Sequence, residues 1–238
     1  LRIGPSAGEP GSASATKARP DEIDRELLEP MMDLGLFRLF IGIEAGTAEA
    51  LSQLGRTQRL EDNERALALL NELSVHTCFN LLLWNPDSTL EDVVLNVEWL
   101  REHPHNPMNF SRTEVYAGTP LLGQLQESGR LLGDYWGYDY QVADPRAEQA
   151  LAIAYAAFRE RNFGRTSLHH LSMRVDYEYH LLAHFFGEHE ALRGEVKSFV
   201  RAVNFDTCEH LESIVRACAD GIADRGAFTA RVVEAVHR

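Results

Sequence analysis

Between residues 20 and 132, apolar positions recur with a helical period in some stretches and run continuously in others. The helical period predicts helices over 21–33, 60–73 and from about 88 to 103. Short apolar runs without proline predict buried strands over 36–43, 75–84 and 109–116. We expect Asp21 to cap the first helix, and Thr47 and Pro120 to open two shorter ones. Strands that alternate with helices indicate an α/β fold with a parallel sheet and right-handed crossovers.

The strand pattern ends near residue 140, and the remaining chain has helical periodicity. We expect helices over 145–162, 167–186, 189–203, 206–220 and 226–237. The chain therefore divides into a linker or frayed edge over 1–19, an α/β unit over 20–132 and an all-helical C-terminal domain over 133–238. Three strands are too few to close a barrel. We expect an unprotected sheet edge and apolar face, and hence low stability of this chain alone.

Composition narrows the class of protein. The 238 residues are 45% hydrophobic and 25% charged, as in ordinary globular domains. The net charge of −13 argues against a nucleic-acid partner bound through a broad basic face. Neither a long apolar run nor a signal peptide is present, so no membrane partner is expected. The three cysteines lie far apart and form no disulfide framework, which indicates a cytoplasmic protein.

Three turns follow the expected strands, at 44–47, 84–87 and 116–119. In parallel α/β folds, ligands bind at the carboxyl ends of the strands. A glutamate at such an end can accept hydrogen bonds from a ribose diol, and a nearby arginine can bind a carboxylate in a bidentate manner. The turns therefore indicate a site for a small polar ligand.

Three segments of the chain together resemble a known family. Residues 18–56, 80–100 and 115–131 resemble the fourth, fifth and sixth strand regions of radical S-adenosylmethionine (SAM) enzymes, in family order and spacing. The run that begins at Pro86 (PDSTLED) is similar to the subgroup that carries a cobalamin-binding domain. The resemblance implies a partial (β/α)6, TIM-type barrel comprising about strands four to six, followed by the helical domain.

The resemblance also implies five cofactor-binding residues. Glu44 matches the position that contacts the SAM ribose, and Arg56 the arginine that binds the methionyl carboxylate. Asn80 matches a polar position that reaches the ribose or the amino group. Tyr116 matches the point where the last strand meets the adenine, and Asn85 lies in the turn beside it. Ordinary roles compete: a cap or ion pair for Glu44, a surface position for Arg56, and a satisfied core amide for Asn80.

The family's CxxxCxxC loop is absent, and so is its glycine-rich motif after the second strand. That loop holds the [4Fe–4S] cluster that chelates SAM. The resemblance thus implies a C-terminal fragment whose cluster ligands lie in a missing N-terminal segment or a companion chain. The intact enzyme would bind SAM, the cluster and, by its subgroup, cobalamin, and would methylate or rearrange a small-molecule substrate. The alternative is a non-catalytic, degenerate barrel module that binds a nucleotide-like ligand or a protein partner.

Histidines in the tail raise the hypothesis of a metal site. His180 and His184 are four residues apart on an expected helix, with His169, His170 and His189 nearby. Two histidines at this spacing can share a metal. However, the chain has no HExxH motif, and apolar residues surround the pair. We therefore expect packing or surface roles for these histidines and no metal ligands, and we expect Cys78 to be a small core residue.

Overall fold

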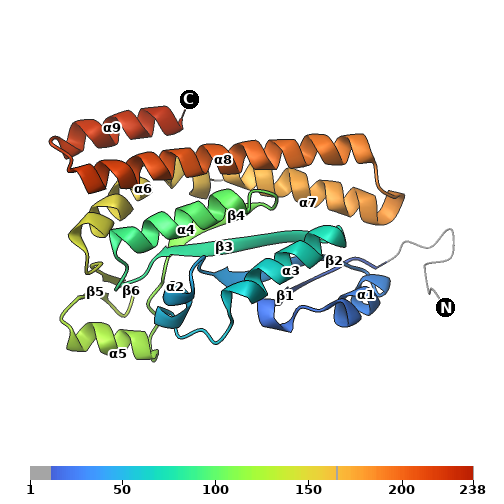
Figure 1. Ribbon diagram of the computed structural model, residues 1–238, viewed down its shortest axis with the longest axis horizontal. Coiled ribbons are helices and arrows are strands. Elements are labelled where there is room, and N and C mark those ends of the chain that lie inside the picture. Colours follow the sequence, from blue (N-terminus) through green and yellow to red (C-terminus); the bar gives the residue numbers. More distant parts are fainter. Residues whose placement is uncertain (1–11, 165, 238) are drawn as a thin grey trace.

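The computed structural model describes residues 12–164 and 166–237. Its centre is a four-stranded parallel sheet in the order β1-β2-β3-β4. The strands are β1 (Ser14–Ala18), β2 (Leu36–Glu44), β3 (His76–Trp84) and β4 (Met108–Arg112). Because the spatial order follows the chain order, each crossover joins neighbouring strands (Figure 1). The expected parallel α/β sheet is confirmed.

Helical crossovers separate the strands, as the periodicity predicted. They are η1 (Pro20–Glu22) and α1 (Arg25–Asp33), then α2 (Ala48–Gln53) and α3 (Leu60–Glu72), then α4 (Leu90–Glu102). Thr47 caps α2 as expected, since its side chain accepts a hydrogen bond from the backbone of Ala50. The prediction that Asp21 caps the first helix is wrong. Asp24 caps α1, whereas the Asp21 carboxylate pairs with Arg19 at 2.9 Å.

After β4 the chain continues through α5 (Pro120–Glu127) and a two-stranded hairpin of β5 (Leu131–Asp134) and β6 (Gly137–Tyr140). Four helices follow: α6 (Pro145–Phe163), α7 (Leu168–Phe186), α8 (Glu190–Asp220) and α9 (Arg225–Val236). The prediction that residues 133–238 are entirely helical is therefore wrong where this hairpin lies. The two helices expected over 189–203 and 206–220 are one continuous helix, which runs along α6, α7 and α4 (Figure 1).

The expectation of a linker over 1–19 is also wrong for part of that stretch, because β1 lies within it. Residues 1–11 lie outside the described residues. The sequence of β1, SATKA, has no apolar alternation, and its side chains are largely exposed. Its backbone pairs with β2 from Ser14 opposite Leu36 to Ala18 opposite Ile41. Backbone pairing, rather than side-chain burial, therefore defines this strand, and local sequence carries little signal of it.

One continuous hydrophobic core joins the sheet to the C-terminal helices. Leu39 and Ile41 on β2 belong to the same buried cluster as Phe158 on α6 and Leu211 on α8. Helix α7 packs against β2 and β3, and α8 packs against α4. The tail thus covers apolar surface that the sheet and its crossovers leave open. The division into domains at residue 132 and the low stability of the isolated chain stay predictions. Among the described residues, no helix has the length and apolar character to cross a bilayer.

Candidate functional site

One face of the sheet keeps partial access to solvent. Along β2, the fully buried Leu39, Ile41 and Ile43 alternate with the half-buried Phe40, Gly42 and Glu44. The same alternation leaves Asn80 and Leu82 on β3, and Asn109 and Ser111 on β4, half-buried. Because successive side chains of a strand point to opposite faces, one face carries the core and the other carries these mixed positions. This second face extends to the carboxyl ends of the strands, where the sequence predicts a ligand site.

Glu44 and Arg56 meet at the carboxyl end of β2. Nη2 of Arg56 donates a hydrogen bond of 2.8 Å to Oε1 of Glu44. The side chains keep exposed fractions of 41% for Arg56 and 22% for Glu44, so a ligand can reach both. A Cβ atom at Gly42 would lie 3.2 Å from Oε1 of Glu44, so glycine there leaves room for the carboxylate. Two of the five expected residues are therefore brought together.

The backbone of Glu44 is in a left-handed conformation, with φ of 65°. Such a conformation is unfavourable for a residue with a Cβ atom, by about 1–2 kcal/mol. Side-chain amides hold the backbone on both sides of Glu44. Asn63 donates to the carbonyls of Ile43 and Ala45, both at 3.1 Å, and the backbone amide of Gly46 donates to Oδ1 of Asn96 at 2.7 Å. The fold therefore imposes this conformation, and strain of this kind concentrates at functional sites.

Asn80 lies on the same partly exposed face, and its Nδ2 donates to Oγ of Ser111 at 2.8 Å. Asn85 is almost fully buried. Its Nδ2 donates to Oε1 of Gln53 on α2, and its Oδ1 accepts from the backbone of Asp87, both at 2.9 Å. Asn85 thus ties the turn after β3 to α2. Its hydrogen-bonding groups have protein partners, and its ligand contact stays a prediction.

Tyr116 has an exposed side chain whose hydroxyl donates to the carboxylate of Glu114. Its backbone oxygen accepts hydrogen bonds from the amide and the hydroxyl of Thr119, which opens α5. Within the described chain, neither Tyr116 nor Asn85 is hydrogen-bonded to Glu44 or Arg56. The structure therefore joins Glu44 with Arg56 and leaves Asn85 and Tyr116 outside that pair.

The three cysteines are free and buried: Cys78 lies on β3, and Cys208 and Cys218 lie ten residues apart on α8. Burial raises the pKa of the Cys78 thiol, that of Cys218 to about 11 and that of Cys208 to about 12. A [4Fe–4S] cluster needs three cysteines that converge on one point, whereas no group of described residues that could hold a metal contains a cysteine. The residues of this chain therefore do not fit a [4Fe–4S] cluster. The expectation that Cys78 is a core residue is confirmed.

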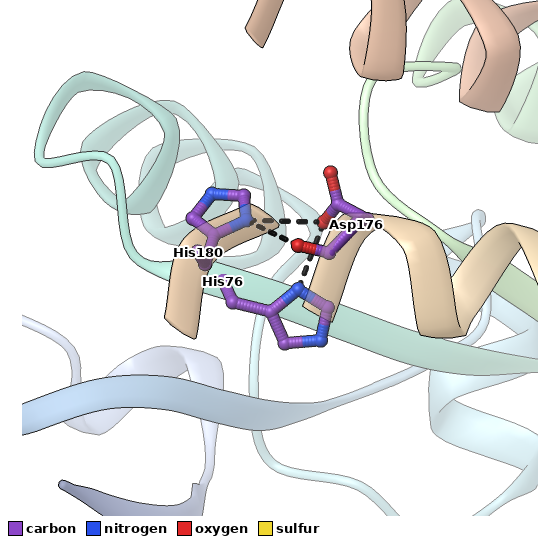
Figure 2. A group of neighbouring side chains, drawn as sticks. All are labelled: His76, Asp176 and His180. Atoms are coloured by element: carbon purple, nitrogen blue, oxygen red, sulfur yellow. Dashed lines mark hydrogen bonds and ion pairs between the residues drawn. The ribbon is translucent and has the colours of Figure 1, made fainter. Parts of the chain in front are cut away.

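A second polar cluster lies at the opposite ends of the strands, between β3, α7 and α8. Figure 2 shows His76, the first residue of β3, facing Asp176 and His180 of α7. Nδ1 of His76 lies 2.8 Å from Oδ2 of Asp176, and Nδ1 of His180 lies 2.7 Å from the backbone oxygen of Asp176. Nζ of Lys197 on α8 lies 2.9 Å from Oδ1 of Asp176. All three residues in Figure 2 are buried.

Burial decides the protonation of this cluster. It lowers the pKa of His180 to about 4, and it lowers the pKa of His76 although the hydrogen bond to Asp176 acts in the opposite direction. Burial alone would raise the pKa of Asp176, but the hydrogen bond with His76 and the charge of Lys197 bring it to about 2. These shifts favour neutral imidazoles at His76 and His180 and an ionised carboxylate at Asp176.

Sequence reasoning considered His180 but missed His76 and Asp176. It paired His180 with His184, whose Nε2 instead lies 2.9 Å from the backbone oxygen of Ser12. The spacing of four residues between Asp176 and His180 on a helix was a usable signal. No local signal pointed to His76, because it lies 100 residues from Asp176 in the chain.

Two surface hollows lie away from both sites. One, of about 420 Å³, lies beside Arg101 and Glu212, and the other, of about 810 Å³, beside Arg161 and Asp206. Both are lined largely by C-terminal helices and contain none of the five expected residues. Each hollow contains one ion pair, Arg101 with Glu212 in the first and Arg161 with Asp206 in the second.

Comparisons with known proteins show a likeness of fold. No protein-family model matches the sequence, and no curated protein matches it significantly. The fold is similar to two structures of the cobalamin-dependent S-adenosylmethionine radical enzyme OxsB. The structure with aqua-cobalamin and S-adenosylmethionine bound has a TM-score of 0.56 at 12% identity, and the apo, selenomethionine-labelled one has 0.57 at 13%. Each alignment covers 97% of this chain and 46% of OxsB.

Elp3 from the archaeon Methanocaldococcus infernus also matches, with a TM-score of 0.44 and 22% identity over 61% of this chain and 32% of that one. The chain thus spans less than half the length of these proteins. At such identities the likeness to OxsB concerns the fold alone. The chain has a radical-SAM-like fold: an α/β structure with a parallel four-stranded sheet and several packed helices.

Proposed function

We propose that this chain forms the SAM-binding wall of a radical SAM enzyme, with the ligand held at the carboxyl ends of β2 and β3. One observation carries the proposal: Glu44 and Arg56 form an accessible ion pair at a strained strand end. The general rule that ligands bind at the carboxyl ends of parallel strands supports this location. The motifs in the sequence and the likeness of fold to OxsB support the same reading.

The pair has spare hydrogen-bonding capacity for both polar parts of SAM. Arg56 uses Nη2 on Oε1 of Glu44, and a guanidinium carries five N–H donors in all. The remaining donors can bind the methionyl carboxylate. The other oxygen of Glu44 can accept the ribose hydroxyls. Asn80, on the same face of the sheet, supplies a further polar contact to the ribose or the amino group.

The electron that cleaves SAM must come from outside this chain. In the intact enzyme, a [4Fe–4S] cluster held by thiolates of another segment or a companion chain would supply that electron. The part played by the present residues is to bind and orient SAM. The same proposal includes three further features. They are cobalamin as a second cofactor, methylation or rearrangement of a small-molecule substrate as the reaction, and a cytoplasmic location. OxsB, which binds aqua-cobalamin, supports the cobalamin part.

Calorimetry of SAM binding to the purified chain tests the proposal. We expect Arg56→Gln and Glu44→Gln each to weaken binding about 10–100-fold, because each removes a charge-assisted hydrogen bond. Arg59→Gln is the matched control, since Arg59 is three residues away and its guanidinium is 71% exposed. Binding by the control should equal that of the wild type. Two results contradict the proposal: the wild-type chain binds no SAM, or all three variants bind SAM as tightly as the wild type.

A second function uses the same site without catalysis: a module that binds a nucleotide-like ligand. The buried cysteines favour it, since no group of described residues that could hold a metal contains one of them. The two functions differ in their need for the methionyl group. Adenosine that binds as tightly as SAM, with no loss in Arg56→Gln, supports the second function. A clear preference for SAM that depends on Arg56 supports the first.

A further inference from the structure

The geometry points to a binding site for a divalent transition metal of the zinc class, formed by His76, Asp176 and His180. The site lies at the amino end of β3, opposite the carboxyl strand end that carries Glu44. It uses none of the residues proposed to bind SAM. The inference is therefore independent of the proposed function, and each can fail without the other.

The three side chains converge on one point. Each offers one ligand atom, and the three atoms lie within 4.8 Å of one another. Oδ2 of Asp176 is 2.8 Å from Nδ1 of His76 and 3.6 Å from Nδ1 of His180. In a tetrahedral site with bonds of about 2.0–2.1 Å, ligand atoms lie roughly 3.4 Å apart. Coordination through Nδ1 of His180 would replace its contact of 2.7 Å with the backbone oxygen of Asp176.

The elements hold these residues without help from the metal. Asp176 and His180 are one turn apart on α7, so their side chains share a face of the helix. His76 comes from the sheet, and burial holds all three side chains in place. Ser172, one turn before Asp176, is also buried, and its hydroxyl has no hydrogen-bond partner among the described residues. It adds an oxygen donor to the same face of α7.

The donor set suits zinc and its neighbours. Two imidazole nitrogens and one carboxylate oxygen are typical ligands of Zn²⁺, whereas Mg²⁺ and Ca²⁺ prefer oxygen atoms alone. Metal binding needs neutral imidazoles and an ionised carboxylate. Coordination through Nδ1 moves each imidazole proton to Nε2, with no net proton release.

Lys197 is the internal competitor of the metal. Its ammonium group lies 2.9 Å from Oδ1 of Asp176 and supplies the positive charge that this buried carboxylate needs. The Lys197 side chain is 20% exposed and donates at 3.4 Å to the backbone oxygen of His105 near the surface. It can therefore turn towards solvent when a metal takes over the charge. Lys197 and the metal should then bind in competition.

Cobalt titration of the chelator-treated, dialysed chain tests the site. Co²⁺ is a spectroscopic substitute for Zn²⁺, and we expect a tetrahedral-type visible absorption that saturates at one metal per chain and is displaced by zinc. His180→Gln should weaken binding by more than about 100-fold, beyond the roughly 10–100-fold loss caused by removal of an outer-shell partner. His184→Gln, one turn further along α7 and outside the cluster, should leave binding unchanged. Circular dichroism checks that both variants are folded.

Lys197→Met separates a metal site from a simple ion-pair network. Removal of the competing charge should tighten cobalt binding by at least about tenfold. Zinc should then raise the melting temperature of this variant more than that of the wild type, because the metal replaces the lost cation. Two results overturn the inference: no cobalt bound by either the wild type or Lys197→Met, or equal loss of binding in His180→Gln and His184→Gln.

Discussion

Nδ1 of His76 lies 2.8 Å from Oδ2 of Asp176, although 100 positions separate the two residues in the chain. The first belongs to the sheet and the second to a helix of the C-terminal tail. This buried polar contact, together with Lys197 of α8, joins β3 to two consecutive helices that lie far from it in the sequence. It makes the orientation of α7 on the sheet specific, because an unpaired carboxylate at this depth would be strongly unfavourable.

Asp176→Asn should lower the free energy of unfolding by about 3 kcal/mol, since it leaves Lys197 without a buried anion. We expect the lower end of the usual range, because Lys197 keeps some access to water. Glu178→Gln is the matched control on α7. Its carboxylate pairs with Arg174 at the surface and is 52% exposed, so its loss should change stability by less than about 1 kcal/mol. Urea denaturation measures both variants, and equal stability of the two contradicts this role of Asp176.

The stability of the chain should fall as the pH is lowered from 6.5 towards 4. Burial lowers the pKa of both His180 and His169 from 6.5 to about 4, so in that window the unfolded chain binds protons that the native chain does not. The stability from the neutral imidazoles is fully present above pH 6.5 and is lost through this window. Each histidine contributes a slope of up to about 1.4 kcal/mol per pH unit.

His180→Gln should make that pH dependence shallower, whereas His184→Gln, outside the cluster, should not. The groups that face His180 are Asp176 and His76 with Lys197 behind them. Asp176 adds its own loss of stability only below about pH 4, because its pKa falls from 3.8 to about 2 on folding. Urea midpoints measured at pH 5 and pH 7 report on the histidines, because Asp176 titrates below both pH values. Equal slopes in both variants would show that His180 does not titrate in this way.

Glu44→Gly should stabilise the chain by roughly 0.5–1 kcal/mol and weaken SAM binding about 10–100-fold, as expected for Glu44→Gln. Glycine removes the cost of the left-handed backbone, partly offset by its greater freedom in the unfolded chain. Ser74→Gly is the matched control, because Ser74 has a φ of 56° in the turn before β3. It should give a similar gain in stability and leave SAM binding intact. A loss of stability in Glu44→Gly alone would mean that the ion pair with Arg56 outweighs the strain.

Gly46→Ala should lower the free energy of unfolding by about 1–3 kcal/mol. A Cβ atom at this position would lie 2.5 Å from Cβ of Trp99. Trp99 is buried and its ring stacks on His103 at 4.0 Å, so it has little room to move. Gly123→Ala in α5 is the control, since a Cβ atom there meets no atom within 4 Å, and it should be stabilising. Gly46→Ala with wild-type stability would contradict this packing.

The sequence alone determined the elements that have a strong local pattern. The apolar runs of β2 and β3, and the periodicity of α3 and α7, predicted those elements to within about two residues. Glu44 and Arg56 were proposed from the resemblance of residues 18–56 to a known family, whereas their ion pair appears only in the structure. The burial pattern of a strand and the period of a helix depend on residues that are neighbours in the sequence. These elements can therefore be predicted without knowledge of the rest of the chain.

Only the tertiary structure decided the features that depend on distant partners. Strand β1 exists because the backbone of β2 offers hydrogen bonds to it, and nothing in SATKA predicts burial. Helix α8 stays continuous through residue 205 because its inner face packs along α4, α6 and α7. His76, Asp176 and Lys197 come together from three elements. The physical reason is common to all three: their stabilising partners lie far away in sequence, where no local pattern records them.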